Sequence, residues 1–380
     1  MIHDLGAGPD GQSTDGGILP ARAGSERTDS SRYRRSLPSP VVLIPGANPE
    51  APFVRDDRAI LDTLVPVEEV VPGRGALACL RFAWTLHRLC RRRRPRLVAS
   101  WFAAPGYGTV ARAVARAHGV RLLVISGGAD VANQPDGFGE AGRPMRRRLV
   151  RRILEAADVV WAFSRAAARE LEVVARPRRL EVVPPPVDTG FFRPASIPRE
   201  RLVLSASAAI NRITLRQKGI ARVMAVAREL PDVPFAIVGC VERSDPEVER
   251  AVAAAPKNVR WEGFVSRETL RDLYARATVF LQLSTHEGFG VAIAEAVAMG
   301  CVPVVSDLAA VREVIGSNGV VVPFDAKAAD IAREIARVLA EPARVSDGWP
   351  GIHDRFGLDV RRRAWARELG IERPVVGERS

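Results

Sequence analysis

The fold is decided by one stretch of the chain, Ser284-Thr285-His286-Glu287-Gly288-Phe289-Gly290-Val291-Ala292-Ile293-Ala294-Glu295-Ala296-Val297-Ala298-Met299-Gly300. An apolar run at residues 278–283 precedes it, and a second apolar run at residues 301–305 follows it. Two apolar strands that flank a glycine-bearing turn and a helix form one unit of a parallel α/β sheet. The stretch therefore predicts a layered α/β protein, with Gly288 and Gly290 in the turn between strand and helix.

The same alternation fills two successive arrays, at residues 39–195 and 196–350, and a proline-rich linker at residues 187–200 joins them. Strands are expected at residues 41–44, 67–71, 96–101, 120–125, 158–163 and 180–183, and then at 202–206, 234–239, 259–261, 278–283, 301–305 and 320–322. We therefore expect two β/α domains with a cleft between them, the usual place for a ligand. Residues 1–38 lack periodicity and are expected to form a disordered leader. A last helix at about residues 355–372 is expected to pack back on the first domain.

The composition is that of a globular protein with an excess of basic charge. The chain carries +12 at neutral pH, and nearly all of its cations are arginines, because lysine occurs only three times. Such a balance favours an anionic partner such as a phosphate-bearing ligand or an anionic membrane face. No apolar run reaches the roughly 18 residues that span a bilayer, and the four cysteines have no metal-ligand spacing. We expect a cytoplasmic protein, or one peripheral on the inner membrane face, without a metal site.

Two carboxylates bracket the start of the helix in the opening stretch. A helix N-terminus presents unpaired N–H groups and partial positive charge, which suits a phosphate. Gly288 and Gly290 would let the backbone approach such an anion closely, and Glu287 and Glu295 could accept hydrogen bonds from sugar hydroxyls. An alternative is that Glu287 only starts the helix and Glu295 lies on the surface.

Two cations follow the first strand of the second array. Arg212 and Lys218 lie at the carboxyl end of that strand, and Gly219 begins the next helix. Placed there, they could neutralise a diphosphate as it leaves. The alternative is that both are ordinary solvated charges.

These pieces together resemble the retaining GT-B glycosyltransferases, especially glycosyltransferase family four. The residues from Glu287 to Glu295 resemble the family's E-x7-E motif, and Arg212 with Lys218-Gly219 resembles its phosphate-binding arginine and lysine. The segments 157–164 and 182–194 resemble its "alanine-aspartate, strand, serine" segment and its valine-proline linker. The resemblance covers residues 40 to 370, and it implies the GT-B fold, in which two Rossmann-like β/α/β domains face each other across a cleft.

The resemblance also implies a role for each motif residue. Glu295 would bind the nucleotide ribose, Glu287 would touch the donor sugar, and Arg212 and Lys218 would hold the diphosphate. The donor would also lie against the backbone of Gly288, Phe289, Gly290 and Val291. The implied reaction transfers a hexose with retention, without a metal ion or other cofactor, from a nucleotide sugar bound by the second domain. The first domain would bind a glycan, lipid-linked or small-molecule acceptor.

The sequence departs from the family pattern on the acceptor side. Many members carry a histidine before a Gly-x-Asp in the first domain, where this chain reads Ser126-Gly127-Gly128-Ala129-Asp130. Either Asp130 or backbone groups are expected to serve the acceptor there. This departure keeps open a non-catalytic nucleotide-sugar-binding protein, and a GT-B sugar-nucleotide epimerase or phosphorylase is a further alternative.

Other patterns suggest different partners. Residues 106–111 match the dinucleotide fingerprint G-x-G-x-x-A, but the first glycine follows its strand too late for the tight turn. Arginines cluster at residues 91–96 and 146–152, which indicates a solvated basic face or an anionic membrane surface, and Phe82, Trp84 and Leu86 beside the first cluster favour the membrane. We expect no nucleic-acid partner, because few aromatic residues interleave with these clusters.

Overall fold

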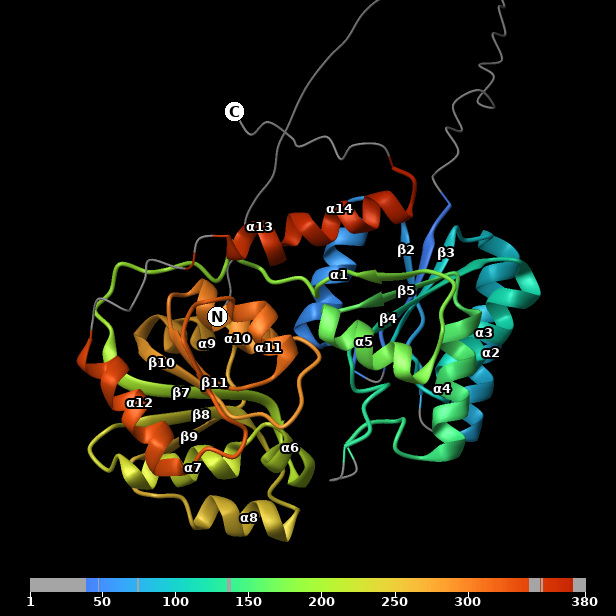
Figure 1. Cartoon of the computed structure of the whole chain (residues 1–380). Coiled ribbons are helices and arrows are strands. Elements are labelled where there is room, and N and C mark those ends of the chain that lie inside the picture. Colours follow the sequence, from blue (N-terminus) through green and yellow to red (C-terminus); the bar gives the residue numbers. More distant parts are fainter. Residues whose placement is uncertain are drawn as a thin grey trace, which may run out of the picture. The chain divides into compact units, whose positions relative to one another are not determined.

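The computed structural model of the chain describes residues 39–46, 48–73, 75–134, 138–341, 349 and 351–371. The leader predicted for residues 1–38 lies outside the described residues. Within them the predicted fold class is confirmed, because the chain forms two six-stranded parallel sheets, each covered by helices (Figure 1).

The first sheet has the strand order β2-β1-β3-β4-β5-β6. Its strands are β1 (Val41–Ile44), β2 (Val67–Glu69), β3 (Leu97–Trp101), β4 (Arg121–Ser126), β5 (Val159–Ala162) and β6 (Leu180–Val182). Its helices are α1 (Pro52–Asp62), α2 (Ala76–Arg93), α3 (Tyr107–His118), α4 (Pro144–Ala156) and α5 (Arg165–Val174). Helix α2 packs on α3, α3 on α4 and α4 on α5, so these four form one layer, while α1 packs on the returning helix α14 (Figure 1). The central strands β1, β3, β4 and β5 are short apolar runs buried on both faces, as a parallel sheet requires, whereas the edge strands β2 and β6 are partly exposed.

The second sheet has the strand order β12-β11-β10-β7-β8-β9. Its strands are β7 (Glu200–Ile210), β8 (Phe235–Val241), β9 (Val259–Gly263), β10 (Ala277–Gln282), β11 (Val302–Ser306) and β12 (Val320–Val322). Its helices are α6 (Arg212–Gln217), α7 (Ile220–Glu229), α8 (Pro246–Ala253), α9 (Arg267–Arg276), α10 (Val291–Ala298), α11 (Ala309–Ile315) and α12 (Ala328–Ala340). This is the 3-2-1-4-5-6 order of dinucleotide-binding sheets, so the chain reverses direction across the sheet between β7 and β10.

The end of the chain returns to the first sheet through α13 (Ile352–Phe356) and α14 (Leu358–Glu368). Arg361 of α14 donates two hydrogen bonds of 2.7 and 2.6 Å to the carboxylate of Asp57 on α1, and the indole of Trp365 donates a third of 2.8 Å. Asp57 and Arg361 are both fully buried, and the ring of Trp161 lies 4.6 Å from that of Trp365. Helix α14 is thereby fixed to the first sheet.

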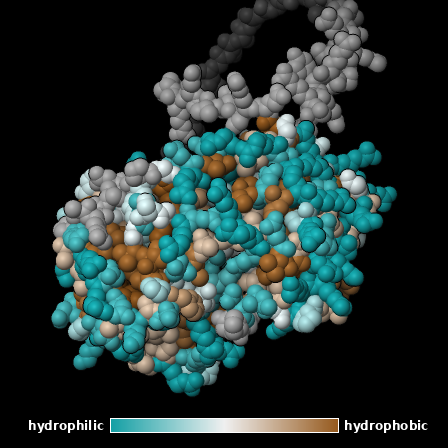
Figure 2. All heavy atoms as spheres, in the orientation of Figure 1, coloured by the Kyte–Doolittle hydropathy of each residue, from teal (hydrophilic) through white to brown (hydrophobic). Residues whose placement is uncertain are grey.

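Two short helices of the structure were not predicted. Helix α6 begins at Arg212 because Asn211 and Thr214 form a reciprocal capping box. The side-chain oxygen of each accepts a hydrogen bond from the backbone amide of the other. The six residues of α6 carry too few apolar positions to produce a helical period. Helix α13 has five residues, which are also too few to show a helical period in the sequence. Among the described residues, no helix combines the length and apolar character needed to cross a bilayer. Hydrophilic side chains cover most of the visible surface, and hydrophobic residues lie in separate patches (Figure 2).

Candidate active site

The candidate site lies at the carboxyl ends of β7 and β10, where the strand order of the second sheet reverses. Ligands of open α/β sheets bind outside the carboxyl ends of strands at such a point. The loop after β10 carries the opening stretch of the sequence and leads to Gly290, which caps α10 with φ of +100°. The loop after β7 leads through α6 to Lys218 and Gly219. The sheet order therefore brings together two segments that are about 70 residues apart.

Lys218 and Glu287 form an ion pair at this point. The ammonium nitrogen of Lys218 lies 2.7 Å from Oε1 of Glu287, and the hydroxyl of Ser284 donates to the same oxygen at 2.8 Å. The side-chain amide of Gln282 donates in turn to Ser284 at 2.8 Å. The Glu287 side chain is buried, whereas a quarter of the Lys218 side chain is exposed. Lys218 is therefore the partner that a ligand can reach from solvent.

The backbone around Gly219 holds Lys218 in this position. Gly219 has φ of +71°, and a Cβ there would lie 2.0 Å from the carbonyl oxygen of Leu283. Only glycine permits this approach of the α6–α7 turn to the end of β10. Gln217 closes the junction, because its side-chain amide donates to the His286 carbonyl at 2.9 Å and its own carbonyl accepts from the Thr285 amide at 2.8 Å. Sequence reasoning did not identify Gln217 or Ser284, although both stand beside predicted site residues.

Arg212 is not brought to this ion pair. It is the first residue of α6, at the opposite end of that helix from Lys218, and its side chain is 65% exposed. Its guanidinium lies 3.9 Å from the carboxylate of Asp245. The predicted contact between Arg212 and a diphosphate stays a prediction.

Glu295 lies within α10, and its carboxylate is buried. The hydroxyl of Tyr274 lies 3.2 Å from Oε2 of Glu295 and 3.3 Å from the carbonyl of Ala292. Burial raises the pKa of Glu295 to about 7, while the bond from Tyr274 and the charge of Arg267 oppose the rise. The alternative that Glu295 is a surface residue is wrong, because only 9% of the residue is accessible to solvent.

Arg267 links this region to the linker and to the first half of the chain. Its guanidinium donates to Asp188 of the linker at 2.9 Å, lies 4.0 Å from Asp56 of α1, and stacks 4.5 Å over the ring of Phe191. Burial raises the pKa of Asp56 to about 6; the positive Arg267 opposes the rise and the negative Asp188 adds to it. We call Asp56, Asp188, Arg267 and Glu295 the carboxylate cluster. Sequence reasoning missed its first three members, which come from three separate segments.

The motif loop touches the first half of the chain at glycine residues. A Cβ on Gly288 would lie 2.2 Å from the carbonyl oxygen of Gly127, and the hydroxyl of Ser164 donates to the Gly288 carbonyl at 2.9 Å. The ring of Phe289 is buried and lies 5.0 Å from that of Phe356. Only the backbone of Phe289 is therefore placed to meet a ligand, together with the start of α10 at Val291.

His286 and Asp130 both have protein partners at this contact. The ring nitrogen Nε2 of His286 lies 2.9 Å from a carboxylate oxygen of Glu170 on α5. Asp130 is buried and accepts hydrogen bonds from the Ser126 hydroxyl and from the amides of Ala103 and Gly128. Burial raises the pKa of Asp130, and these hydrogen bonds oppose the rise. Asp130 thus holds the loop after β4 in shape, and its predicted role toward the acceptor stays a prediction.

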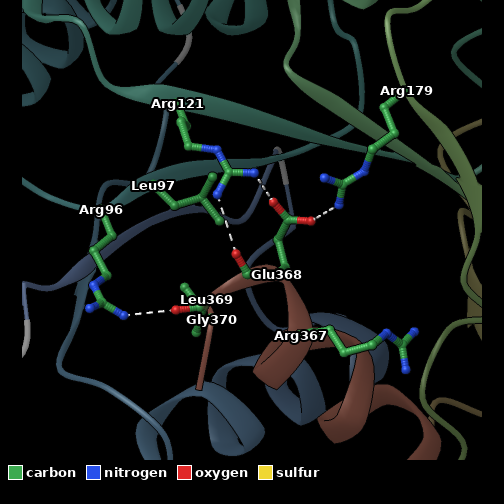
Figure 3. A pocket seen from close by; sticks show the side chains of 8 residues that line it. All are labelled: Arg96, Leu97, Arg121, Arg179, Arg367, Glu368, Leu369 and Gly370. Atoms are coloured by element: carbon green, nitrogen blue, oxygen red, sulfur yellow. Dashed lines mark hydrogen bonds and ion pairs between the residues drawn. The ribbon is translucent and has the colours of Figure 1, made fainter. Parts of the chain in front are cut away.

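A pocket of about 460 Å³ lies away from this site, at the amino ends of strands in the first sheet (Figure 3). Arg121 and Arg179 both bind the carboxylate of Glu368, and Arg96 donates to the Leu369 carbonyl at 2.7 Å. Arg367 points away from Glu368. The last carbonyls of a helix lack intrahelical partners and carry partial negative charge. Arg96, Arg121 and Arg179 therefore anchor the C-terminal end of α14.

Comparison with known sequences defines the class of the protein. The profile of Glycosyltransferase Family 4 matches residues 39–191, and the profile of Glycosyl transferases group 1 matches residues 208–341. Together they cover both sheets, so the chain belongs to the family-4-like glycosyltransferases of the GT-B fold.

Curated relatives and solved structures agree with this class. The chain is 30% identical over 226 residues to alpha-maltose-1-phosphate synthase of Mycolicibacterium smegmatis, which covers 52% of this chain and 58% of the relative. It is 31% identical over 231 residues to the MMP alpha-(1->4)-mannosyltransferase of Mycolicibacterium hassiacum, which covers 58% and 52%. The chain thus spans a little over half the length of these relatives.

Among solved structures, the sucrose-phosphate synthase of Thermosynechococcus elongatus superposes with a TM-score of 0.71 at 17% identity, over 87% of this chain and 99% of that one. HepE of Anabaena, in complex with UDP and glucose, gives 0.70 at 16% identity with the same coverage. At these identities the likeness shows the fold.

Proposed function

We propose that this chain is a retaining glycosyltransferase that moves a hexose from a nucleotide-diphosphate sugar to a glycan, lipid-linked or small-molecule acceptor. The observation that carries the proposal is the Lys218–Glu287 pair, 2.7 Å apart, beside the N-terminus of α10 at the switch point of the second sheet. A cation and a helix N-terminus at one point suit a diphosphate, and a carboxylate beside them suits sugar hydroxyls.

The leaving group of such a transfer is a nucleoside diphosphate, whose negative charge grows as the bond to the sugar breaks. Fixed positive groups aimed at that charge accelerate the step more than any other single factor. Lys218 has three N–H donors, so it can keep Glu287 and still bind a phosphate oxygen. With the amides at the start of α10, it would supply the charge that a metal ion supplies in other transferases. Retention of configuration follows from the family resemblance.

The two glutamates of the motif would hold different parts of the donor. Glu287 lies in the loop next to Lys218 and would accept from the sugar, whereas Glu295 lies further along α10 and would accept from the ribose. HepE of Anabaena, which is similar in fold at 16% identity, has also been solved in complex with UDP-glucose, a donor of this type.

The acceptor would bind to the first domain, against the loop at residues 126–130 that meets Gly288. The names of curated relatives include a D-inositol 3-phosphate glycosyltransferase and a mannosyltransferase acting on a cellobiosyl-diphosphopolyprenol. Both a small phosphorylated acceptor and a lipid-linked one are therefore proposed classes. The reaction would take place in the cytoplasm or at the inner face of a membrane, where nucleotide sugars are available.

A thermal-shift screen across UDP-, GDP- and ADP-sugars tests donor binding. A bound donor raises the melting temperature, and the rise grows with donor concentration above the dissociation constant. Incubation with the binding donor, labelled in its sugar, then separates the alternatives. Transfer of label to an acceptor supports the transferase, an altered free nucleotide sugar indicates an epimerase, and binding without turnover across both acceptor classes indicates a non-catalytic binding protein.

A further inference from the structure

Helix α2 has a second apolar face that points away from the protein core. Leu77, Leu80 and Trp84 are 79%, 67% and 60% exposed. Spacings of three and four residues put these side chains on one stripe of the helix. The opposite face carries Phe82 and Leu86, which are buried against the first sheet. The sequence-based grouping of Phe82, Trp84 and Leu86 as one membrane-facing set is therefore wrong, because the structure divides them between two faces.

The helix layer that contains this stripe is strongly basic. Helices α2, α3 and α4 together contain twelve arginines and one glutamate. On α2 itself, exposed Arg88, Arg91 and Arg92 continue the outward face toward the C-terminal end of the helix. Among the described residues, two of the layer's arginines form ion pairs with carboxylates, Arg93 with Glu68 and Arg146 with Glu140. The layer therefore keeps a large positive charge around an exposed apolar stripe.

The stripe lies toward the acceptor side of the first domain. Helix α2 follows β2 and precedes β3, so it starts at the carboxyl edge of the sheet and ends at the amino edge. Leu77, Leu80 and Trp84 occupy its first half, nearer to the edge that carries the loop at residues 126–130. The guanidinium of Arg88 stacks 5.1 Å over the Trp84 ring. A tryptophan with a neighbouring arginine suits the boundary between lipid headgroups and acyl chains.

We propose that the outward face of α2 binds to the surface of an anionic lipid bilayer, with Leu77, Leu80 and Trp84 in the headgroup–acyl boundary and the arginines on lipid phosphates. The reaction would then take an acceptor that is itself held in that membrane, an assignment that rests on the proposed function. An amphipathic helix with a basic polar face and Trp and Leu on the other lies in the bilayer interface in this way.

Two other occupants fit the surface less well. A nucleic acid would meet the arginines but would leave three large apolar side chains against a charged backbone. A second copy of this chain would place the same face against itself, and the basic layers would then repel each other. Both occupants are outcomes of the test below.

Vesicle flotation with the full chain tests the proposal. We expect binding to vesicles that contain about one third phosphatidylglycerol in phosphatidylcholine, and weak binding to phosphatidylcholine alone. Replacing Arg88, Arg91 and Arg92 with glutamine should weaken binding about a hundredfold, since each basic residue near an anionic surface contributes roughly fivefold. Leu80→Ser with Trp84→Ser should abolish binding that survives in high salt. Val173→Ser on α5, an equally exposed apolar residue, and Arg333→Gln on α12 should change nothing.

Tryptophan fluorescence gives a second readout that a folding defect does not imitate. Of the six tryptophans, Trp101, Trp161 and Trp365 are fully buried, Trp349 is 7% exposed and Trp261 is half-buried, so Trp84 is the most exposed. A blue shift on adding vesicles should therefore disappear in Trp84→Phe while flotation persists. The α2 variants should keep the donor-induced rise in melting temperature and full turnover of a water-soluble acceptor. Equal binding of all variants, no preference for the anionic lipid, or capture of RNA or a second copy in place of vesicles would overturn the proposal. Failed donor binding would overturn the proposed function instead.

Discussion

Replacing Glu295 with glutamine should stabilise the free protein at pH 8 and weaken donor binding. The Glu295 carboxyl is buried inside α10 with the hydroxyl of Tyr274 3.2 Å away. Burial raises its pKa to about 7, whereas glutamate in an unfolded chain titrates near 4.3. Glu295 therefore lowers the free energy of unfolding at any pH where the unfolded chain has already lost this proton.

The size and sign of the effect follow from these two pKa values. Below about pH 4.3 the carboxyl is protonated in both states and does not affect the free energy of unfolding. As the pH rises from about 4.3 to about 7, the unfolded chain loses the proton first, so the free energy of unfolding falls until the folded carboxyl has ionised as well. The difference of roughly 2.7 pKa units, at about 1.4 kcal/mol each, amounts to about 3.5 kcal/mol at pH 8. Glutamine cannot ionise but can still accept the hydrogen bond from Tyr274. Glu295→Gln should gain about 3.5 kcal/mol in the free energy of unfolding at pH 8, and about 1 kcal/mol at pH 5.

Urea denaturation of both proteins at pH 5 and pH 8 measures this difference. Tyr274→Phe is the matched variant, because it removes the bond that favours the ionised carboxylate and should move the pH dependence upward. Calorimetric titration with the donor measures the effect on binding. The affinity of the unmodified protein for the donor should fall about tenfold between pH 8 and pH 6, because Glu295 gains a proton over this range. An equal gain at both pH values would show that the carboxyl does not titrate as its burial requires.

Three further predictions concern other parts of the molecule. Lys218→Ala should slow transfer by about a hundredfold or more in a chain that still folds, whereas Lys327→Ala should leave the rate unchanged; a fully active Lys218→Ala would remove this residue from the diphosphate site. Gly288→Ala would place a methyl group 2.2 Å from the Gly127 carbonyl, so transfer should drop by about a hundredfold in a steady-state assay, and a normal rate would show that the two loops need not touch. Asp57→Ala should lower the free energy of unfolding by about 3 to 5 kcal/mol in urea denaturation, because it leaves Arg361 buried without its partner; a loss below 1 kcal/mol would contradict the anchoring of α14.

The sequence was sufficient to predict the sheets because their signal is local. Each strand is an apolar run of a few residues, and each helix has its own period or cap, as Ser164 and Ser266 show by accepting from the amides three residues on. The run from β10 through Gly290 to α10 also predicts that the motif lies at the carboxyl edge, since connections in parallel sheets leave from that edge. These features do not depend on distant residues.

The carboxylate cluster could not be predicted, because it exists only in the folded chain. Asp56, Asp188 and Arg267 are each ordinary charged residues in helix or linker sequences. Their meeting depends on how the linker and α9 pack against α1, and no spacing encodes that. The surroundings of Arg212 could not be predicted either, although its place in the sequence suggested that it binds the same diphosphate as Lys218. The helix formed by the residues between them points the two side chains to different surroundings.

The two glutamates of the motif show why one spacing can carry two functions. The carboxylate of Glu287 lies 2.7 Å from the ammonium group of Lys218 and accepts a hydrogen bond from the hydroxyl of Ser284. A cation therefore lies beside Glu287 before a ligand binds. Within the part of the chain that the structure describes, the side chain of Glu295 has one hydrogen-bond partner, the phenol of Tyr274, and burial raises the pKa of Glu295 to about 7. A carboxyl that is costly to ionise binds most favourably when a ligand's hydroxyls supply the missing hydrogen bonds. Glu295 therefore suits recognition of the hydroxyls of the neutral ribose, whereas Glu287 suits the hydroxyls of the donor sugar and Lys218 beside it suits the diphosphate.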